Sequence, residues 1–191
     1  RQQRQRLKRD RKLIKAIHQQ LATLSIEQSS FYSALTRLDT PSKHGNESTE
    51  FLISTIPGQP PMPLQKIASG GELSRISLAV QVVTAKTTTT PSLVFDEVDA
   101  GIGGATGDKV GRLLRELGES TQVLCVTHLA QVASKAHQHL RVNKTLSKKE
   151  ASSEIELLGG ESKVHEIARM MGGEIKSAQS LAHAREMIDA L

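Results

Sequence analysis

The chain has 191 residues, 37% of them hydrophobic, which is enough for one globular domain with an appendage. Its single cysteine, Cys125, lies in an apolar run and excludes a disulfide framework and a cysteine-based zinc site. The chain opens with Arg1 and has no apolar run long enough to cross a bilayer. We therefore expect part of a longer cytoplasmic protein with no membrane partner.

Positive charge is concentrated at the start of the chain. The net charge is +5, but the first fifteen residues alone carry +7, so residues 16–191 carry about −2. The basic residues of that segment are Arg1, Arg4, Arg6, Lys8, Arg9, Arg11, Lys12 and Lys15. If the chain has a nucleic-acid-binding surface, we expect it in this segment. A solvated helix face is an alternative that explains the same charges equally well.

The first predicted element is a helix. Its apolar residues, at a and d positions of a heptad interrupted by Asp10, are Leu7, Ile14, Ile17, Leu21 and Leu24. This pattern is typical of the end of a coiled coil and equally of an ordinary amphipathic helix. A helix this polar needs a partner, which we expect from outside the chain. We therefore assign residues 1–29 to a coiled-coil arm and residues 30–191 to the globular part.

Two short strands are predicted next, at 31–38 and 50–56, joined as a hairpin by a polar stretch. The prolines between Pro57 and Pro63 then predict an extended loop without regular structure.

From Ala68 onward the pattern alternates between helix and strand. Helical spacing of apolar residues occurs at 73–83, 110–117 and 129–136, and apolar strands occur at 93–95 and 123–126. Such a βαβ unit predicts a parallel sheet with flanking helices. Alternating residues at 140–142 and 155–157 predict an antiparallel edge hairpin, and two amphipathic helices separated by Gly172 and Gly173 close the chain. The predicted fold class is α/β.

A first candidate site is the start of the helix at 69–72. Ser69 can cap that helix and Glu72 can reach back to it, as a capping box. Capping alone does not explain Gly70 and Gly71 in the first turn, where each glycine costs about 1 kcal/mol relative to alanine. Glycines there let an anion approach the free backbone N–H groups, so we predict a phosphate contact.

A second candidate site follows the strand at 93–95, which ends in Asp96 and Glu97. The carboxyl ends of parallel strands face the ligand crevice. Asp96 can hold Mg²⁺ there, and Glu97 can deprotonate an attacking water. A helix-capping acidic turn is the alternative, but the glycine-rich stretch at 98–104 favours a loop held against a ligand.

The third candidate is His128, directly after the strand at 123–126, so we expect it at the same edge of the sheet. An imidazole in that position can hydrogen-bond a phosphate oxygen or orient water. His137 and His139 form an H-x-H pair without a third ligand at a plausible spacing, and we expect both at the surface.

Together these motifs resemble the signature motif, Walker B, D-loop and H-loop of ABC-type ATPases, within the group of the SMC proteins and RecN. The match is closest to RecN. Ser69–Arg75 reads SGGELSR, Phe95–Gly104 reads FDEVDAGIGG, and Val126–Ala133 reads VTHLAQVA. Where the family commonly has Asn-Pro-Gly, this chain has Ile56-Pro57-Gly58.

The resemblance implies the C-terminal lobe of an ATPase head that acts with ATP and Mg²⁺ in DNA double-strand break repair and recombination, near the nucleoid. Asp96 would coordinate Mg²⁺, Glu97 would be the general base, and His128 would sense the γ-phosphate. The nucleotide of a second head would be contacted by Ser69, Gly70, Gly71 and Glu72, and Asp99 would lie at that interface.

One necessary part of such a site is not in this sequence. A phosphate-binding loop of the Walker A type needs Gly followed by Lys, and the chain contains no such pair. The resemblance therefore implies that the N-terminal half of the same head is a partner and that this chain alone is inactive. The alternative is a non-catalytic DNA-binding or dimerisation module that uses the basic N-terminal arm.

Overall fold

The computed structural model describes residues 2–43, 45–85, 91–146, 151–172 and 177–190, and the side chains of residues 2–9, 145, 146 and 151 lie outside that description. The helices are α1 (Gln2–Thr23), α2 (Gly70–Thr84), α3 (Gly104–Gly118), α4 (Ala130–Ala133), α5 (Gly160–Met170) and α6 (Ala178–Asp189), with a 3-10 turn η1 (Leu64–Lys66). The strands are β1 (Ser30–Ser42), β2 (Gly45–Ser54), β3 (Met62–Pro63), β4 (Ser92–Phe95), β5 (Gln122–Cys125), β6 (His139–Leu146) and β7 (Ala151–Leu158).

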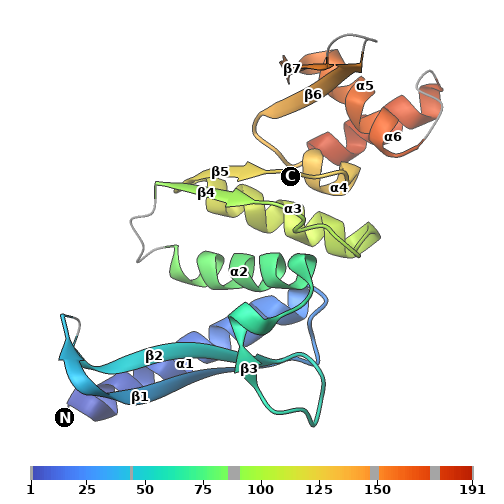
Figure 1. The fold of residues 1–191 in the computed structure, drawn as a ribbon. Coiled ribbons are helices and arrows are strands. Elements are labelled where there is room, and N and C mark those ends of the chain that lie inside the picture. Colours follow the sequence, from blue (N-terminus) through green and yellow to red (C-terminus); the bar gives the residue numbers. More distant parts are fainter. Residues whose placement is uncertain (1, 44, 86–90, 147–150, 173–176, 191) are drawn as a thin grey trace.

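These elements form a stack that follows chain order, with α1 on α2, α2 on α3, α3 on α4 and α4 on α5 (Figure 1). The β1–β2 hairpin lies beside α1 at one end, and the hairpin of β6 and β7 lies with α5 and α6 at the other. The predicted α/β class is confirmed.

Helix α1 is present as predicted, but its second half is part of the globular core. Ile17 and Leu21 of α1, and Leu24 directly after it, are buried in the same cluster as Ile76 of α2. The partner that we expected from outside the chain is thus supplied by the chain itself for this half of the helix. The side chains of Leu7, Arg4, Arg6, Lys8 and Arg9, and all of Arg1, lie outside the described part.

The first sheet has the order β1-β2-β3 and is antiparallel. Its register places Phe31 opposite Ile53. The hairpin is longer than predicted, because Gly45 and the polar residues 47–49 pair with β1 as well. The proline-rich loop is also not wholly irregular. Pro63, on an edge strand where no N–H is needed, lies opposite Leu52.

The central unit is the predicted βαβ crossover. Strands β4 and β5 are parallel, and α3 covers one face of the pair with Val110, Leu114 and Leu117. These three residues recur at i, i+4 and i+7, which puts them on one face of a helix.

The C-terminal part has a core of its own, formed by Ala130, Ala133, Val164, Ile167, Ala168 and Ala184. The predicted edge hairpin is present, with Leu140 opposite Leu157 in β6 and β7. The end of α6 is fixed to the rest of the chain by Lys135, whose buried Nζ donates to the carbonyl oxygens of Met187 at 2.9 Å and Ala190 at 2.7 Å.

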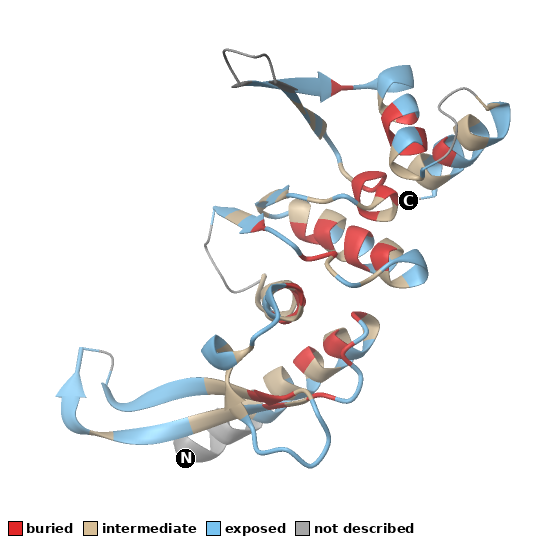
Figure 2. Ribbon diagram, turned by 45° about the vertical axis from the view of Figure 1, so that its right-hand side comes forward, coloured by how far each residue is buried: buried red, intermediate tan, exposed pale blue. Residues whose placement is uncertain are grey.

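Two faces of the structure are apolar and open to solvent. On the β4–β5 pair, opposite α3, these are Val94 at 68% exposure, Leu124 at 47% and Val126 at 63%. On β6 and β7 they are Leu140, Val142, Ile155 and Leu157. Figure 2 shows the hairpin of β6 and β7 largely in the exposed colour and the β4–β5 pair partly so, whereas α3 carries a buried stripe. No helix in the described ranges has the length and hydrophobicity to span a bilayer.

Candidate functional site

The carboxyl ends of β4 and β5 lie side by side, as predicted. Parallel pairing puts Phe95 opposite Cys125. Asp96 and Glu97 follow the first strand and His128 follows the second, so the three leave the sheet at one edge. All three are exposed.

Glu97 turns back sharply from the strand. Its backbone is left-handed, with φ of 55°, which is uncommon for a residue other than glycine. The Oδ1 atom of Asp96 accepts its N–H at 2.9 Å, and the Glu97 carbonyl accepts the N–H of Ala100 at 3.0 Å. The side chain is thereby directed onto the first turn of α2, where a Cβ atom added to Gly70 would meet Glu97 Oε2 at 2.7 Å.

Helix α2 begins as its sequence predicts. The Oγ of Ser69 accepts the backbone N–H of Glu72 at 3.3 Å, which is the Ser69 half of the capping box. Ser69 and Gly70 are exposed at this end. The free N–H groups and the positive end of the helix dipole favour an anion there.

Gly71 has a different reason for being glycine than the one we expected. It is buried, and a Cβ atom added to it would lie 2.8 Å from the Cβ of Ala100 and 3.0 Å from the Ala100 carbonyl oxygen. Close packing of the turn at 96–100 on α2 therefore accounts for Gly71 without any ligand. At Gly70, by contrast, a Cβ atom would meet only the side chain of Glu97, and the predicted phosphate contact stays a prediction for both glycines.

Two further residues of α2 fasten it to the same turn. The Oγ of Ser74 donates to the carbonyl of Asp96 at 2.7 Å, and Nη1 of the buried Arg75 donates to the carbonyl of Ala100 at 2.8 Å. Burial lowers the pKa of Arg75, and the Glu72 carboxylate partly offsets that effect. Sequence reasoning did not find either residue as part of the site. The spacing of four between Gly71 and Arg75 was the available signal, because it places both on one helix face.

Asp99 faces inward, although the resemblance placed it at an interface between two heads. Its side chain is 2% exposed. The Oδ2 atom accepts the hydroxyl of Thr127 and the backbone N–H groups of His128 at 3.0 Å and Leu129 at 3.3 Å. It also lies 3.3 Å from Nδ1 of His128, whose side chain is 73% exposed. Asp99 therefore joins the turn after β4 to the turn after β5.

The environment of Cys125 between these turns is unfavourable to negative charge. Burial raises the pKa of its thiol to about 12, and the carboxylates of Asp99 and Asp96 contribute to the same shift. Cys125 is consequently a packed thiol and not a nucleophile.

The described residues contain no group of three or more His, Cys, Asp or Glu side chains that could hold a metal ion. Mg²⁺ commonly keeps several waters and takes one or two carboxylates together with phosphate oxygens. Asp96 fits a site of that kind.

Of the two histidines expected at the surface, only His137 is exposed. His139 is half-buried, and burial lowers its pKa.

Comparison with curated proteins gives several close relatives. The chain is 46% identical over 186 residues to the DNA repair protein RecN of Vibrio cholerae, which covers 97% of this chain and 34% of that protein. It is 55% identical over 151 residues to the DNA repair protein RecN of Xylella fastidiosa, covering 79% of this chain and 27% of the relative. The chain belongs to the RecN family. It spans about a third of the length of these RecN relatives, and no protein-family model matches it.

Solved structures show the same fold. An Smc head domain with a coiled coil and joint from Pyrococcus yayanosii has a TM-score of 0.58 at 21% identity, covering 83% of this chain and 29% of that one. An Smc head domain from Pyrococcus furiosus, bound to the C-terminal domain of ScpA, has a TM-score of 0.55 at 20% identity, covering 84% and 38%. The RecN-family chain described here therefore has the fold of part of an SMC-type ATPase head.

Proposed function

We propose that this chain is part of an SMC-like ATPase of DNA double-strand break repair and recombination, and that it supplies the signature motif, Walker B and H-loop to that enzyme. The observation that carries the proposal is the convergence of three motifs on the turn at 96–100. That turn holds Glu97 against Gly70 and Asp99 against the turn of His128.

Each exposed residue of this site has a proposed role. Asp96 would hold Mg²⁺, and Glu97 would take the proton of the attacking water as general base. His128 contacts the terminal phosphate. Bound ATP and Mg²⁺ would supply the phosphoryl group and the cation that neutralises its charge. The chain alone is inactive in this proposal, because its sequence has no Gly–Lys pair for a Walker A loop.

The N-terminal half of the same head is the proposed partner for the open faces of this chain. Val94 of β4, Leu124 of β5 and Val126 directly after β5 form an apolar surface that α3 does not cover. Within the described residues β5 pairs with β4 alone, so its second edge is free to pair with another strand. Both features are those of an unfinished sheet, and the relatives are about three times longer than the region matched.

A second head is the proposed partner of the start of α2. Ser69 and Gly70 are the exposed residues at that end, so they are assigned to the nucleotide held by the second head. Glu72, behind Ser69, is a supporting residue of the same turn. Gly71 and Asp99 are buried within the chain and are assigned to its own packing. DNA as a partner, and a cytoplasmic, nucleoid-associated location, are proposed from the RecN relatives.

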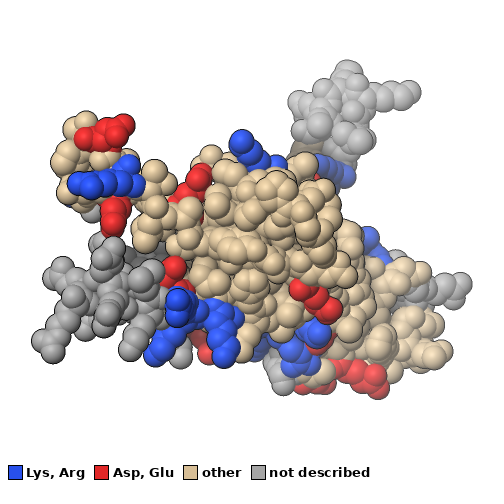
Figure 3. Space-filling model, turned by 90° about the horizontal axis from the view of Figure 1, so that it is seen from below, with Lys and Arg blue, Asp and Glu red and all other residues tan. Residues whose placement is uncertain are grey.

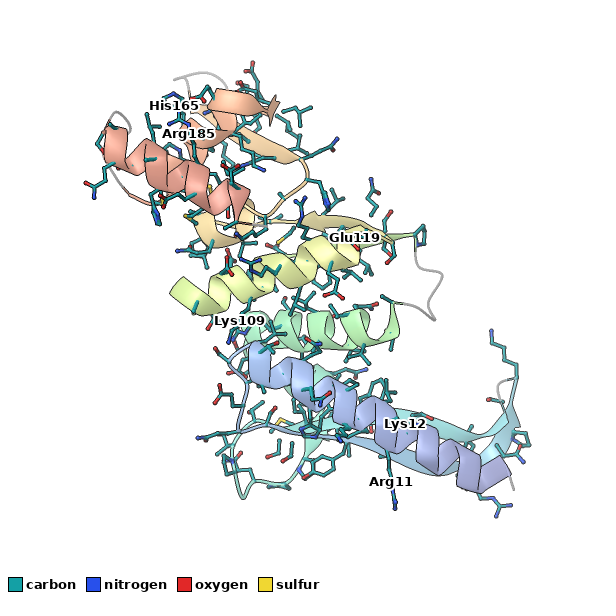
Figure 4. All side chains as sticks on the ribbon, turned by 180° about the vertical axis from the view of Figure 1, so that it is seen from behind. Arg11, Lys12, Lys109, Glu119, His165 and Arg185 are labelled. Carbon is teal, nitrogen blue, oxygen red and sulfur yellow. The ribbon has the colours of Figure 1, made fainter. Side chains whose placement is uncertain are left out.

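The proposal is tested by Glu97→Gln in the full-length protein, with Glu119→Gln as control. Glu119 is exposed at the far end of α3 (Figure 4). Loss of a general base lowers the rate by about 100-fold or more. We expect kcat for ATP to fall by that much in Glu97→Gln with nucleotide binding retained, and to stay unchanged in the control. Equal turnover in both variants would remove Glu97 from the mechanism.

A DNA-binding or dimerisation module that uses the N-terminal helix is the second candidate. Arg11 and Lys12 are exposed on α1, as Figure 4 shows. On the face drawn in Figure 3, however, the described Lys and Arg side chains are interspersed with Asp and Glu and form no continuous basic field. This candidate predicts salt-dependent DNA binding that is lost on removing residues 1–15, and no effect of Glu97→Gln.

A further inference from the structure

We propose that Asp99 is a positioning residue for His128, a role that rests on the function proposed above. The starting point is a single oxygen atom. Oδ2 of Asp99 accepts the Thr127 hydroxyl and two successive backbone N–H groups, those of His128 at 3.0 Å and Leu129 at 3.3 Å. One carboxylate therefore fixes the whole turn that carries the histidine.

The Asp99 carboxylate is itself held in place. It is nearly fully buried, and the turn that carries it is closed by the hydrogen bond from the N–H of Ile102 to its carbonyl at 3.3 Å. The hydrogen bond from Arg75 to Ala100 ties that turn to α2. A buried carboxylate needs several donors to offset its lost hydration, and the turn at 127–129 provides them. The two turns stabilise each other.

The imidazole of His128 has no other side-chain anchor among the described residues. It is 73% exposed, and its Nδ1 lies 3.3 Å from Oδ2 of Asp99. A carboxylate only accepts hydrogen bonds, so the nearby Asp99 favours the imidazole form with its hydrogen on Nδ1. Nε2 is thereby the nitrogen left to act outward, on a water molecule or a phosphate oxygen. Asp99 fixes both where the imidazole lies and which nitrogen it presents.

The test is a double-mutant cycle in the full-length protein with Asp99→Asn and His128→Gln. Asparagine keeps the shape of Asp99 but removes the negative charge beside Nδ1 of His128. When one residue acts through another, the double mutant loses less activity than the two single mutants' losses added together. We expect Asp99→Asn to lower kcat about tenfold in the wild-type background, with little change in KM for ATP, and to have no further effect once His128 is glutamine.

Each outcome bears on a separate claim. If Asp99→Asn lowers kcat by the same factor in both backgrounds, or raises KM for ATP without lowering kcat, the positioning role is overturned. Asp99 would then be a stabilising residue only. A His128→Gln variant with wild-type turnover would instead overturn the role of His128 in the proposed function. If Asp99→Asn does not fold, Thr127→Val with Thr127→Ser as control tests the same contact. The valine variant is then expected to show the same dependence on His128, and the serine variant to keep wild-type turnover.

Discussion

A Cβ atom placed on Gly71 would lie 2.8 Å from the Cβ of Ala100, closer than two carbon atoms can pack. The obstacle at Gly71 includes the Ala100 backbone, whereas at Gly70 it is the mobile end of Glu97. Overpacking of this kind costs about 1–3 kcal/mol. We expect Gly71→Ala to lower the free energy of unfolding by that amount in urea denaturation, and Gly70→Ala not to lower it. A stabilised Gly71→Ala variant would refute the packing of the turn on α2.

Lys135 is predicted to hold the C-terminal helix. Its Nζ donates to two carbonyl oxygens at the end of α6 and lies 3.2 Å from Asp108, whose side chain is partly exposed and therefore adds little. Lys135→Met should lower the free energy of unfolding by about 2 kcal/mol, the size of hydrogen bonds from a charged donor. Lys109→Met, at an exposed site on α3 (Figure 4), is the control and should have no measurable effect. Similar unfolding curves for the two variants would contradict the anchoring role.

Stability is predicted to fall in mild acid through Glu166. Hydrogen bonds from Arg169 and then from Arg141 hold the pKa of this buried carboxyl below its ordinary value of 4.5, while burial acts in the opposite direction. A depressed folded-state pKa stabilises the fold above about pH 4.5, and that contribution is lost as the pH falls through the lower value. In urea unfolding, the difference between wild type and Glu166→Gln should shrink as the pH is lowered from 5 toward 3. A difference independent of pH would show that the ion pairs are not responsible.

Cys125 is predicted to be inert in the folded chain. Its pKa of about 12 leaves very little thiolate at pH 8.5, and it is the only cysteine, so one reaction reports on one site. Alkylation by iodoacetamide at that pH should be more than about tenfold slower for the native chain than for the chain in urea. Comparable rates would mean that the end of β5 is open or that the local charges differ from those described.

Much of this fold could be predicted from local pattern. The spacing of Val110, Leu114 and Leu117 gave a helix, and the run at 123–126 gave a strand, because both periodicities are set by backbone geometry. The heptad pattern at the start of the chain predicted a helix but not the element against which that helix packs. Ile17 and Leu21 meet α2, more than fifty residues away, and no local signal records that contact. The polar residues 45–49 likewise form a strand only because β1 pairs with them.

The candidate site could likewise be predicted only where local pattern and strand geometry determine it. Asp96, Glu97 and His128 could be placed together, because the carboxyl ends of parallel strands share one edge of a sheet. The inward direction of Asp99 depends on donors about thirty residues later, at His128 and Leu129. The packing of Gly71 could not be predicted, because the residue that it packs against, Ala100, lies on another turn.

The most direct test of the central claim is ATP turnover by this chain, by a separately produced N-terminal half, and by their mixture. We predict no turnover by either part, turnover by the mixture, and loss of turnover with Glu97→Gln. Leu124→Glu should weaken association of the halves by at least about tenfold, and Leu35→Glu, similarly exposed on β1, should not. Turnover by this chain alone, or none in a mixture whose halves are shown to associate, would contradict a split ATPase head.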